Sequence, residues 1–320
     1  MRRAGGQALS LLAAPLNVHI LKTLAEGPKE LIDLRRSVGS PPQSTMRVYS
    51  RTLIDLGLLE QQRQDALSGS SLYALTPSGA ALLGVGEILQ EWLNESPDGP
   101  IELGSTLAKS TVGALIEGWS TNIVRALAAK PLSLTQLNRL IPKVSYPSLE
   151  RRLGGLRLAS LVEPHPGEGR GTPYRTTWWL RRAVVPLTAA AGWERKHLPE
   201  SAPPIGRLDV EAAFLLAIPL MALPDSLTGK CRLAVELQGG ASPVFAGVLV
   251  HIEEGRVASC SSRLDGEVEG WVSGTPLAWL RRMNGHGNGN EGLETGGDVG
   301  LALTVTDALH AANSVNGDLN

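Results

Sequence analysis

The chain contains one segment twice, and this internal repeat limits the folds that are open to it. The residues LNVHILKTLAEGP, from Leu16 to Pro28, correspond to WSTNIVRALAAKP, from Trp119 to Pro131, at an offset of 103. Further along the chain, Trp92 corresponds to Trp193 at an offset of 101. Self-similarity over this length predicts two domains of one fold. Because the matched positions are mostly apolar, they indicate a shared core, and function has to be sought where the copies differ.

The composition supports real hydrophobic cores and limits the classes of chemistry. With 320 residues, of which 42% are hydrophobic, the chain is long enough for two or three domains and too apolar for a disordered protein. Cys231 and Cys260 are its only cysteines, which argues against a disulfide scaffold or a cysteine-rich zinc site. The GxxxxGK[ST], GxSxG, HExxH and CxxC motifs do not occur. We therefore expect no catalytic residues, no metal and no cofactor, and a protein that is not an enzyme.

Charge is distributed unevenly along the chain. Residues 1–99 carry 9 basic and 10 acidic side chains, residues 100–200 carry 14 and 7, and residues 201–320 carry 7 and 14. A basic middle part predicts a polyanionic partner. The alternative is that the acidic C-terminal part neutralises the basic part by docking on it, and both interpretations stay open.

The N-terminal residues MRRAGGQALSLLAAPL have the charge and apolar pattern of a signal peptide. The apolar run continues into the first repeat, however, where His19 and Lys22 follow at helical spacing. We therefore expect a helix of a cytoplasmic protein. No uncharged apolar run is long enough to span a bilayer, so we expect no membrane partner.

Each copy of the repeat predicts three helices, a β-hairpin and a last helix. Gly57 is expected to end the third helix of the first copy. Ser44 or a neighbour is expected to cap that helix, and Ser145 to cap the third helix of the second copy. Three short helices followed by a hairpin are typical of a winged helix-turn-helix domain, whose third helix enters the major groove of DNA. The expected helices cover residues 16–25, 30–38, 44–56, 76–92, 118–129, 134–141, 147–158 and 181–197, with strands at 58–62 and 71–75 and a second hairpin at 162–178.

Proline-rich linkers divide the chain into three domains, at residues 8–96, 104–200 and 205–312. The third domain predicts helices at 210–221, 275–283 and 298–311, strands at 231–238, 244–252 and 256–262, and a strand or turn at 267–272. Residues 284–290 and the polar tail are expected to be flexible. The fold class expected for the whole chain is α+β, with two tandem winged helix-turn-helix domains followed by an α+β domain.

Residues 10–200 resemble a tandem pair of HxlR-type winged-helix regulators. The segments GWSTNIVRAL, SYPSLERRLGGLRLASLVE and YALTPSGAALLGVGEILQEW carry the resemblance. Leu16 stands where that family has a tryptophan, residues 176–179 replace its Leu-Thr element, and its N-terminal cysteine is missing from both copies. The resemblance implies DNA binding without thiol-based sensing. Since the family works as homodimers of single domains, one chain here would supply both halves or would itself dimerise.

Residues 205–312 resemble a sterol-carrier-protein-like domain, on the segments VEGWVSGTPLAWLRRM and GLETGGDVGLALTVTDAL. That fold encloses an apolar tunnel between its sheet and its helices, which implies a hydrophobic small-molecule ligand. Trp271 and Trp279 are the candidate ligand-binding residues, and the alternative is that both are ordinary core residues. Cys260, in an apolar strand, is expected to be unreactive.

The candidate DNA-binding residues lie on the third helices and the hairpins, where arginine can bind guanine or phosphate and serine can donate to the backbone. Arg151 and Arg152 are expected to face outward because Leu149, Leu153 and Leu156 form the core stripe. The alternative for the second copy is a set of solvated surface arginines, and for the first copy a degenerate domain used for packing or dimerisation. The candidates are Ser44, Thr45, Arg47, Arg51 and Arg63 in the first copy, and Ser145, Tyr146, Ser148, Arg151, Arg152, Arg170 and Arg175 in the second.

Together these observations predict a bacterial transcriptional regulator that binds double-stranded DNA and responds to a hydrophobic small molecule. A first alternative is a protein that sequesters such a molecule for self-resistance. A second is a DNA-repair glycosylase built on winged helices, which would need a buried carboxylate or paired amide side chains facing a flipped base. Asp33, Asp55 and Glu150 are interpreted as surface charges instead.

Overall fold

The computed structural model describes residues 3–63, 71–117, 120–166, 171–237, 243–285 and 291–313. It is a mixed α+β protein, and the strands of these residues form three separate sheets, none of which is closed. Residues 286–290 and 314–320, which belong to the expected flexible loop and tail, lie outside the described part of the chain.

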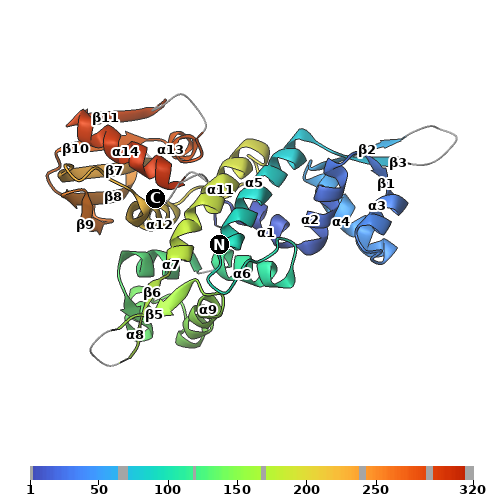
Figure 1. Ribbon diagram of the computed structural model, residues 1–320, viewed down its shortest axis with the longest axis horizontal. Helices are drawn as coiled ribbons and strands as arrows, with labels where there is room; N and C mark the ends of the chain where they lie inside the picture. The colour runs from blue at the N-terminus through green and yellow to red at the C-terminus, as the bar shows by residue number, and fades with distance from the viewer. Residues whose placement is uncertain are drawn as a thin grey trace.

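Repeat one, from α1 to α5, extends from the middle of the molecule, where α1 and α5 lie, to one end, where its sheet lies (Figure 1). Its antiparallel sheet has the order β1-β3-β2. Met46 and Leu53 of α4 are fully buried, which leaves the opposite face of that helix to solvent. Its elements are α1 (Gly6–Ala13), α2 (Pro15–Ala25), β1 (Lys29–Glu30), α3 (Leu31–Ser37), α4 (Gln43–Asp55), β2 (Leu59–Arg63), β3 (Ser71–Leu75) and α5 (Pro77–Asn94).

Repeat two, from α6 to α11, has the same order of elements and a matching sheet, β4-β6-β5. The expected helix at 181–197 is two helices that meet at Ala183. Pro186 explains the break, because proline cannot donate to the carbonyl four residues earlier and collides with it. The elements are α6 (Thr106–Ile116), α7 (Ser120–Ala129), β4 (Leu132–Ser133), α8 (Leu134–Leu140), α9 (Tyr146–Leu158), β5 (Val162–Pro164), β6 (Pro173–Thr176), α10 (Trp178–Arg182) and α11 (Val184–His197).

The same arrangement of hydrogen bonds around a threonine occurs in both repeats. The hydroxyl of Thr76 accepts from the backbone N–H of Gly79 at the start of α5 and donates to the carbonyls of Gly57 and Leu58. Thr177, at the matching position, accepts from the N–H of Leu180 and donates to the carbonyls of Ser160 and Leu161. In each repeat a threonine therefore caps the helix after the hairpin and ties it to the end of the third helix.

The two repeats meet across an approximate two-fold axis. Helix α5 packs against α11, and α1 packs against α6, so that matching helices contact each other (Figure 1). The indole N–H of Trp92 donates to the carbonyl of Trp179 at 2.9 Å, and that of Trp193 donates to the carbonyl of Ser78 at 3.1 Å. At the offset of 101, Trp193 corresponds to Trp92 and Trp179 to Ser78. The two bonds are therefore equivalent, as at the interface of a symmetric dimer.

Two further features make this interface asymmetric. The rings of Trp92 and Trp179 stack with their centroids 4.6 Å apart, and the indole of Trp179 donates to the carbonyl of Trp92 at 2.7 Å. The buried carboxylate of Glu194 in α11 accepts the backbone N–H groups of Gly5, Gln7 and Ala8 at the start of α1. Burial raises the pKa of Glu194, and these three bonds oppose that rise.

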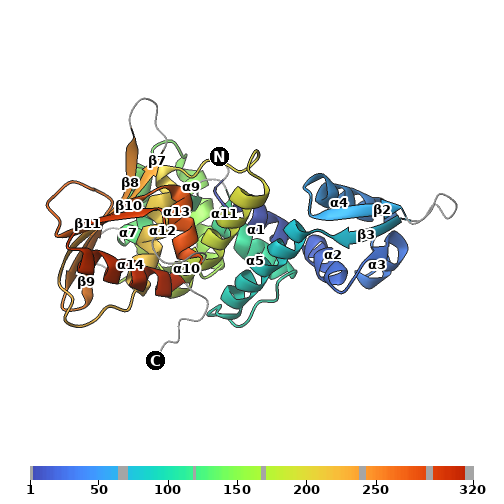
Figure 2. The same cartoon turned by 90° about the horizontal axis from the view of Figure 1, so that it is seen from above.

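The C-terminal unit is a five-stranded sheet with helices packed on it, in the strand order β11-β10-β7-β8-β9. Strands β7 and β10 pair in parallel, and the other neighbours are antiparallel. Both views place this unit beside repeat two and far from the sheet of repeat one (Figures 1 and 2). Its elements are α12 (Arg207–Ala217), a 3-10 turn (Ile218–Leu220), β7 (Gly229–Leu237), β8 (Val244–Glu253), β9 (Arg256–Ser261), β10 (Gly270–Gly274), α13 (Pro276–Met283), β11 (Leu293–Gly297) and α14 (Val299–Asn313).

The apolar N-terminal segment forms two helices rather than one. Within the described ranges no single helix is long and apolar enough to cross a membrane, and α1 and α2 reach that length only as a pair bent by 85°.

The tryptophan interface leads to a first prediction. Replacing Trp92 with Phe is expected to lower the free energy of unfolding by about 1–3 kcal/mol, because the indole hydrogen bond to the carbonyl of Trp179 is lost and a smaller ring fills the buried stack less well. Trp178 is the matched control, since it is 50% exposed whereas Trp92 is 3% exposed, and Trp178→Phe should cost less than about 0.5 kcal/mol. Urea-induced unfolding measures both values, and equal losses would contradict the assignment.

The end of α4 provides a second prediction. Gly57 has a φ of +70°, and a Cβ added there would meet no atom within 4 Å. Gly57→Ala should therefore destabilise the protein by about 1 kcal/mol through backbone strain alone. Gly84, inside α5, also has nothing within 4 Å of an added Cβ and has no positive φ, so Gly84→Ala should stabilise by roughly 0.5–1 kcal/mol. Thermal unfolding of both variants tests the opposite signs.

Candidate nucleic-acid interface

Helices α8 and α9 of repeat two, with the connection between them, carry exposed basic side chains. Leu149, Leu153 and Leu156 bury one side of α9, so that Arg151 on the other side is exposed. Arg139, in the last turn of α8, and Lys143, in the connection to α9, are exposed as well.

Among the described residues, none of these three basic side chains forms an ion pair. We call Arg139, Lys143 and Arg151 the basic face. Sequence reasoning selected Arg151 and missed the other two. Their position beside the turn that precedes the third helix is the signal that would have found them.

The start of α9 differs from the expectation for Ser145. Ser145 is the N-cap residue, but its hydroxyl makes no capping bond and donates to the hydroxyl of Ser148 at 2.9 Å. Tyr146 is 45% exposed beside them. The three residues thus come together on the first turn. In repeat one, Ser44 is not a cap either, because α4 begins at Gln43 after Pro42.

Arg152 does not face solvent in the way that Arg151 does. It is half-buried, and its Nη1 donates to the carbonyl of Glu117 at 3.1 Å, at the end of α6. The expectation that both arginines point outward was wrong for Arg152, because the end of α6 lies within its reach. Arg152 therefore ties the third helix to α6.

The hairpin of repeat two contributes a paired arginine. Arg175 lies opposite Glu163 in the register of β5 and β6, and its Nε donates to that carboxylate at 2.7 Å. Both side chains are exposed, so this surface ion pair competes only weakly with another anion. Arg170 lies outside the described residues.

In repeat one, the third helix borders a groove. This groove of about 890 Å³ lies between α3, α4 and the hairpin, and Arg35, Arg47 and Arg51 line it. Arg51 pairs with Asp55 at 3.1 Å, whereas Arg47 is exposed and has no ion-pair partner in the described part of the chain. The groove also contains Val48, which is 63% exposed.

Of the remaining candidates of repeat one, Ser44 and Thr45 lie together on α4, whereas Arg63 lies at the end of β2. Ser44 is exposed and Thr45 is half-buried near the start of α4. Arg63 ends β2, and its side chain lies outside the part that the structure describes.

Several arginines of the basic middle part are used inside the molecule. Arg125 of α7 bonds to the buried carboxylate of Glu211 in α12 and donates to the hydroxyl of Ser262 at 3.1 Å. Arg181 donates to the carbonyl of Leu215 at 3.1 Å.

Arg182 forms a two-pronged bond with Glu95 of repeat one, at 2.7 and 3.0 Å. The charge count therefore overstates the free positive surface of repeat two, and part of its excess holds the three units together.

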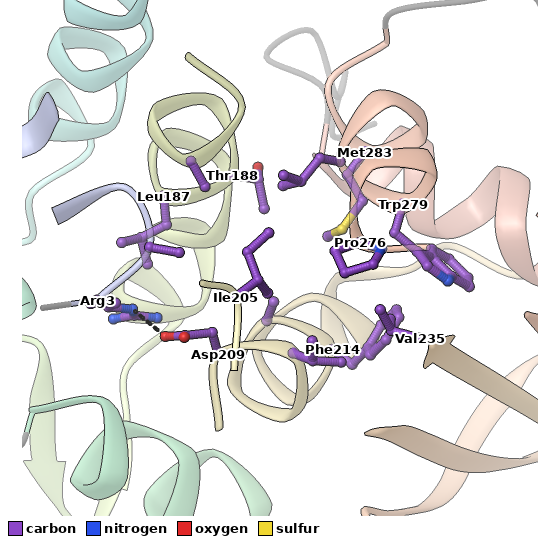
Figure 3. Close-up of a pocket in the computed structure, with 15 residues that line it drawn as sticks. Arg3, Leu187, Thr188, Ile205, Asp209, Phe214, Val235, Pro276, Trp279 and Met283 are labelled. Atoms are coloured by element: carbon purple, nitrogen blue, oxygen red, sulfur yellow. Dashed lines mark ion pairs between the residues drawn. The ribbon is translucent and has the colours of Figure 1, made fainter. Parts of the chain in front are cut away.

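A cavity of about 70 Å³ lies between α11, α12, α13 and the residues before α1 (Figure 3). Trp279 lines it, with its indole donating to the carbonyl of Ala234 at 2.8 Å and its ring edge-on to Phe214. Trp271 does not line it. That ring lies across β10 and β11 against Gly296, where an added Cβ would come within 2.5 Å of it. Of the two tryptophans expected to contact a ligand, the structure places only Trp279 at this cavity.

Both cysteines of the chain lie in the C-terminal unit, Cys231 buried and Cys260 half-buried. Burial raises the pKa of both Cys231 and Cys260 to about 12, which keeps the thiols protonated and unreactive. In the described ranges, no group of three or more His, Cys, Asp or Glu side chains is placed to hold a metal ion.

Comparison with known proteins adds no assignment. No protein-family model matches the chain, and no curated protein is significantly similar to it.

The link between repeat two and the C-terminal unit leads to a third prediction. The carboxylate of Glu211 is 1% exposed and binds both Arg125 and Arg207, whose side chains are 32% and 60% exposed. Arg125→Met should cost about 1–3 kcal/mol of unfolding free energy, less than a fully buried ion pair because Arg207 keeps its bond. Arg207→Met should cost less than about 1 kcal/mol. Equal effects in denaturant titrations would show that Arg125 is not the main partner.

Proposed function

We propose that this protein is a DNA-binding transcriptional regulator built from two tandem winged helix-turn-helix domains. The basic face carries the proposal. Arg139, Lys143 and Arg151 lie on two successive helices and their connection, which in this motif cross the DNA backbone and enter the major groove. Three exposed cations without ion-pair partners in the described residues are suited to bind phosphates and base edges.

The approximate two-fold arrangement supports binding to two half-sites. In Figure 1 the hairpin strands β2–β3 and β5–β6 lie at opposite ends of the central helix pair, as in a dimer that presents two recognition helices. We assign the stronger contact to repeat two. Repeat one has Arg47 free to bind but also exposes Val48 in its groove, so its contribution is weaker.

The C-terminal unit is suited to modulate the second domain. It packs on α7, α10 and α11, and Arg125 joins α7 directly to α12. A ligand that prefers one position of this unit would change the geometry of the DNA-binding part. The resemblances to HxlR-type regulators and to sterol-carrier-like domains agree with this division of roles.

The cavity beside Trp279 favours one alternative, a protein that sequesters a small molecule. The two proposals differ in DNA binding, which only the first requires. A glycosylase is less well supported, because Asp33, Asp55 and Glu150 are exposed, whereas base excision needs a buried group facing a flipped base. The buried carboxylates of Glu194 and Glu211 are already bound, by backbone N–H groups and by arginines respectively.

The experiment is fluorescence-anisotropy binding of the full chain to its own upstream DNA and to a scrambled duplex at two salt concentrations. We expect tighter binding to the native sequence and a steep loss of affinity with salt. Arg151→Ala should weaken specific binding by about 10- to 100-fold, and Lys143→Ala should weaken both duplexes alike and lower the salt slope by about 1.

Arg256→Ala is the control, since Arg256 is exposed on β9 of the C-terminal unit and not on the helices proposed to bind DNA. No binding at low salt, or affinity unchanged by the combined Arg139, Lys143 and Arg151 substitutions, would overturn the proposal.

A further inference from the structure

The cavity between repeat two and the C-terminal unit has two chemically different ends. Phe214, Val235 and Trp279 form an apolar end, while Arg3 and Asp209 face each other at the other end (Figure 3). The walls come from α11, from α12, from α13 and from the residues that precede α1. The site therefore lies at the joint between the units.

Arg3 is a buried cation with an unused donor. Its side chain is 5% exposed, and its Nη1 has no hydrogen-bond partner among the described residues. Burying an N–H group of a charged side chain without a partner is costly, because the group loses its bonds to water. An anionic oxygen in the cavity would supply the missing partner.

Asp209 compensates this charge incompletely. Its Oδ1 lies 3.9 Å from the Nε of Arg3, at the outer limit of an ion pair, while its Oδ2 accepts the backbone N–H of Gly206 at 3.2 Å. Burial raises the pKa of Asp209 and lowers the pKa of Arg3. Both directions show that neither charge is fully stabilised by the other.

We propose that this cavity binds a small monocarboxylate with an apolar ring or a short branched chain. Its carboxylate would accept from the guanidinium of Arg3, and its apolar body would lie toward Phe214 and Trp279. A charge-assisted bond to a buried arginine is among the stronger single polar contacts in proteins. This inference deepens the proposed function by naming the class of ligand, and the binding itself does not depend on DNA.

The size of the cavity connects binding to movement. Its volume of about 70 Å³ is roughly half of the ~150 Å³ that holds a benzene molecule in an engineered protein. A ring-sized ligand must therefore move one wall. Two hydrogen bonds to Thr188 join α11 to the C-terminal unit at this wall. Asn284 donates to the carbonyl of Thr188 at 3.1 Å, and Asn313 donates to the hydroxyl of Thr188 at 3.0 Å.

The test compares three ligands that share one ring. Titration calorimetry of the full chain, without DNA, measures benzoate, benzyl alcohol and benzylamine. We expect benzoate to bind at least about tenfold more tightly than the other two. Arg3→Met, which keeps the length of the side chain, should reduce benzoate affinity about tenfold to the level of benzyl alcohol.

Two further variants make the test independent of Arg3. Asp209→Asn removes the competing negative charge, so benzoate should bind more tightly. Ala213→Leu fills the cavity without changing any charge and should weaken all three ligands. Arg256→Met, the same substitution at an exposed site on β9, should change none of the affinities.

Isovalerate serves as the probe with a short branched chain. The proposal is overturned if benzoate and benzyl alcohol bind equally, or if Arg3→Met leaves the benzoate affinity unchanged. It is also overturned if neither benzoate nor isovalerate binds at concentrations up to about 10 mM. If the benzoate affinity changes in these variants as expected and the protein does not bind DNA, this inference stands and the proposed function is refuted. DNA binding in a protein that binds neither benzoate nor isovalerate would do the reverse.

Discussion

The packing of α5 against α11 holds the two repeats together, and the rest of the molecule depends on it. Trp92 and Trp193 donate to backbone carbonyls at matching positions of the opposite repeat. Since a buried indole N–H without an acceptor is costly, these bonds fix both the contact and its register. The C-terminal unit packs on α7, α10 and α11 of repeat two, so α11 contacts both repeat one and the C-terminal unit.

Most of the fold follows from periodicity and turn chemistry. Gly57 was correctly predicted to end α4, and β3 has the expected bounds. Helix α6 and the short strands β1 and β4 were missed, and α1 was expected only as part of a helix that continues into the first repeat. Helix α6 is stabilised by its contact with α1 of repeat one, whereas β1 and β4 gain their structure by pairing with β3 and β6 of their own repeats. Strand β11 was missed because Leu293–Gly297 is rich in glycine and gains its structure from pairing with β10.

The candidate site was predictable where it is local. Helical spacing placed Arg151 on the exposed face of α9, but it also placed Arg152 there, since spacing cannot show that the end of α6 lies within reach. The net charge of repeat two indicated exposed basic residues, but it overestimated how many of them are free. Arg125 and Arg182 form ion pairs with residues of the other units. Arg3 and Asp209 lie far apart in sequence, and only the docking of the units brings them together.

The tryptophan interface also has a consequence for dilute conditions. Two-fold proteins made of separate subunits come apart as their concentration falls, and their folding stability then depends on how much protein is present. Here the matching halves belong to one chain, so each meets its counterpart at a local concentration that dilution cannot change. A few molecules in a cell would carry both halves assembled, and the two halves are free to diverge, as the basic face of one and the groove of the other illustrate.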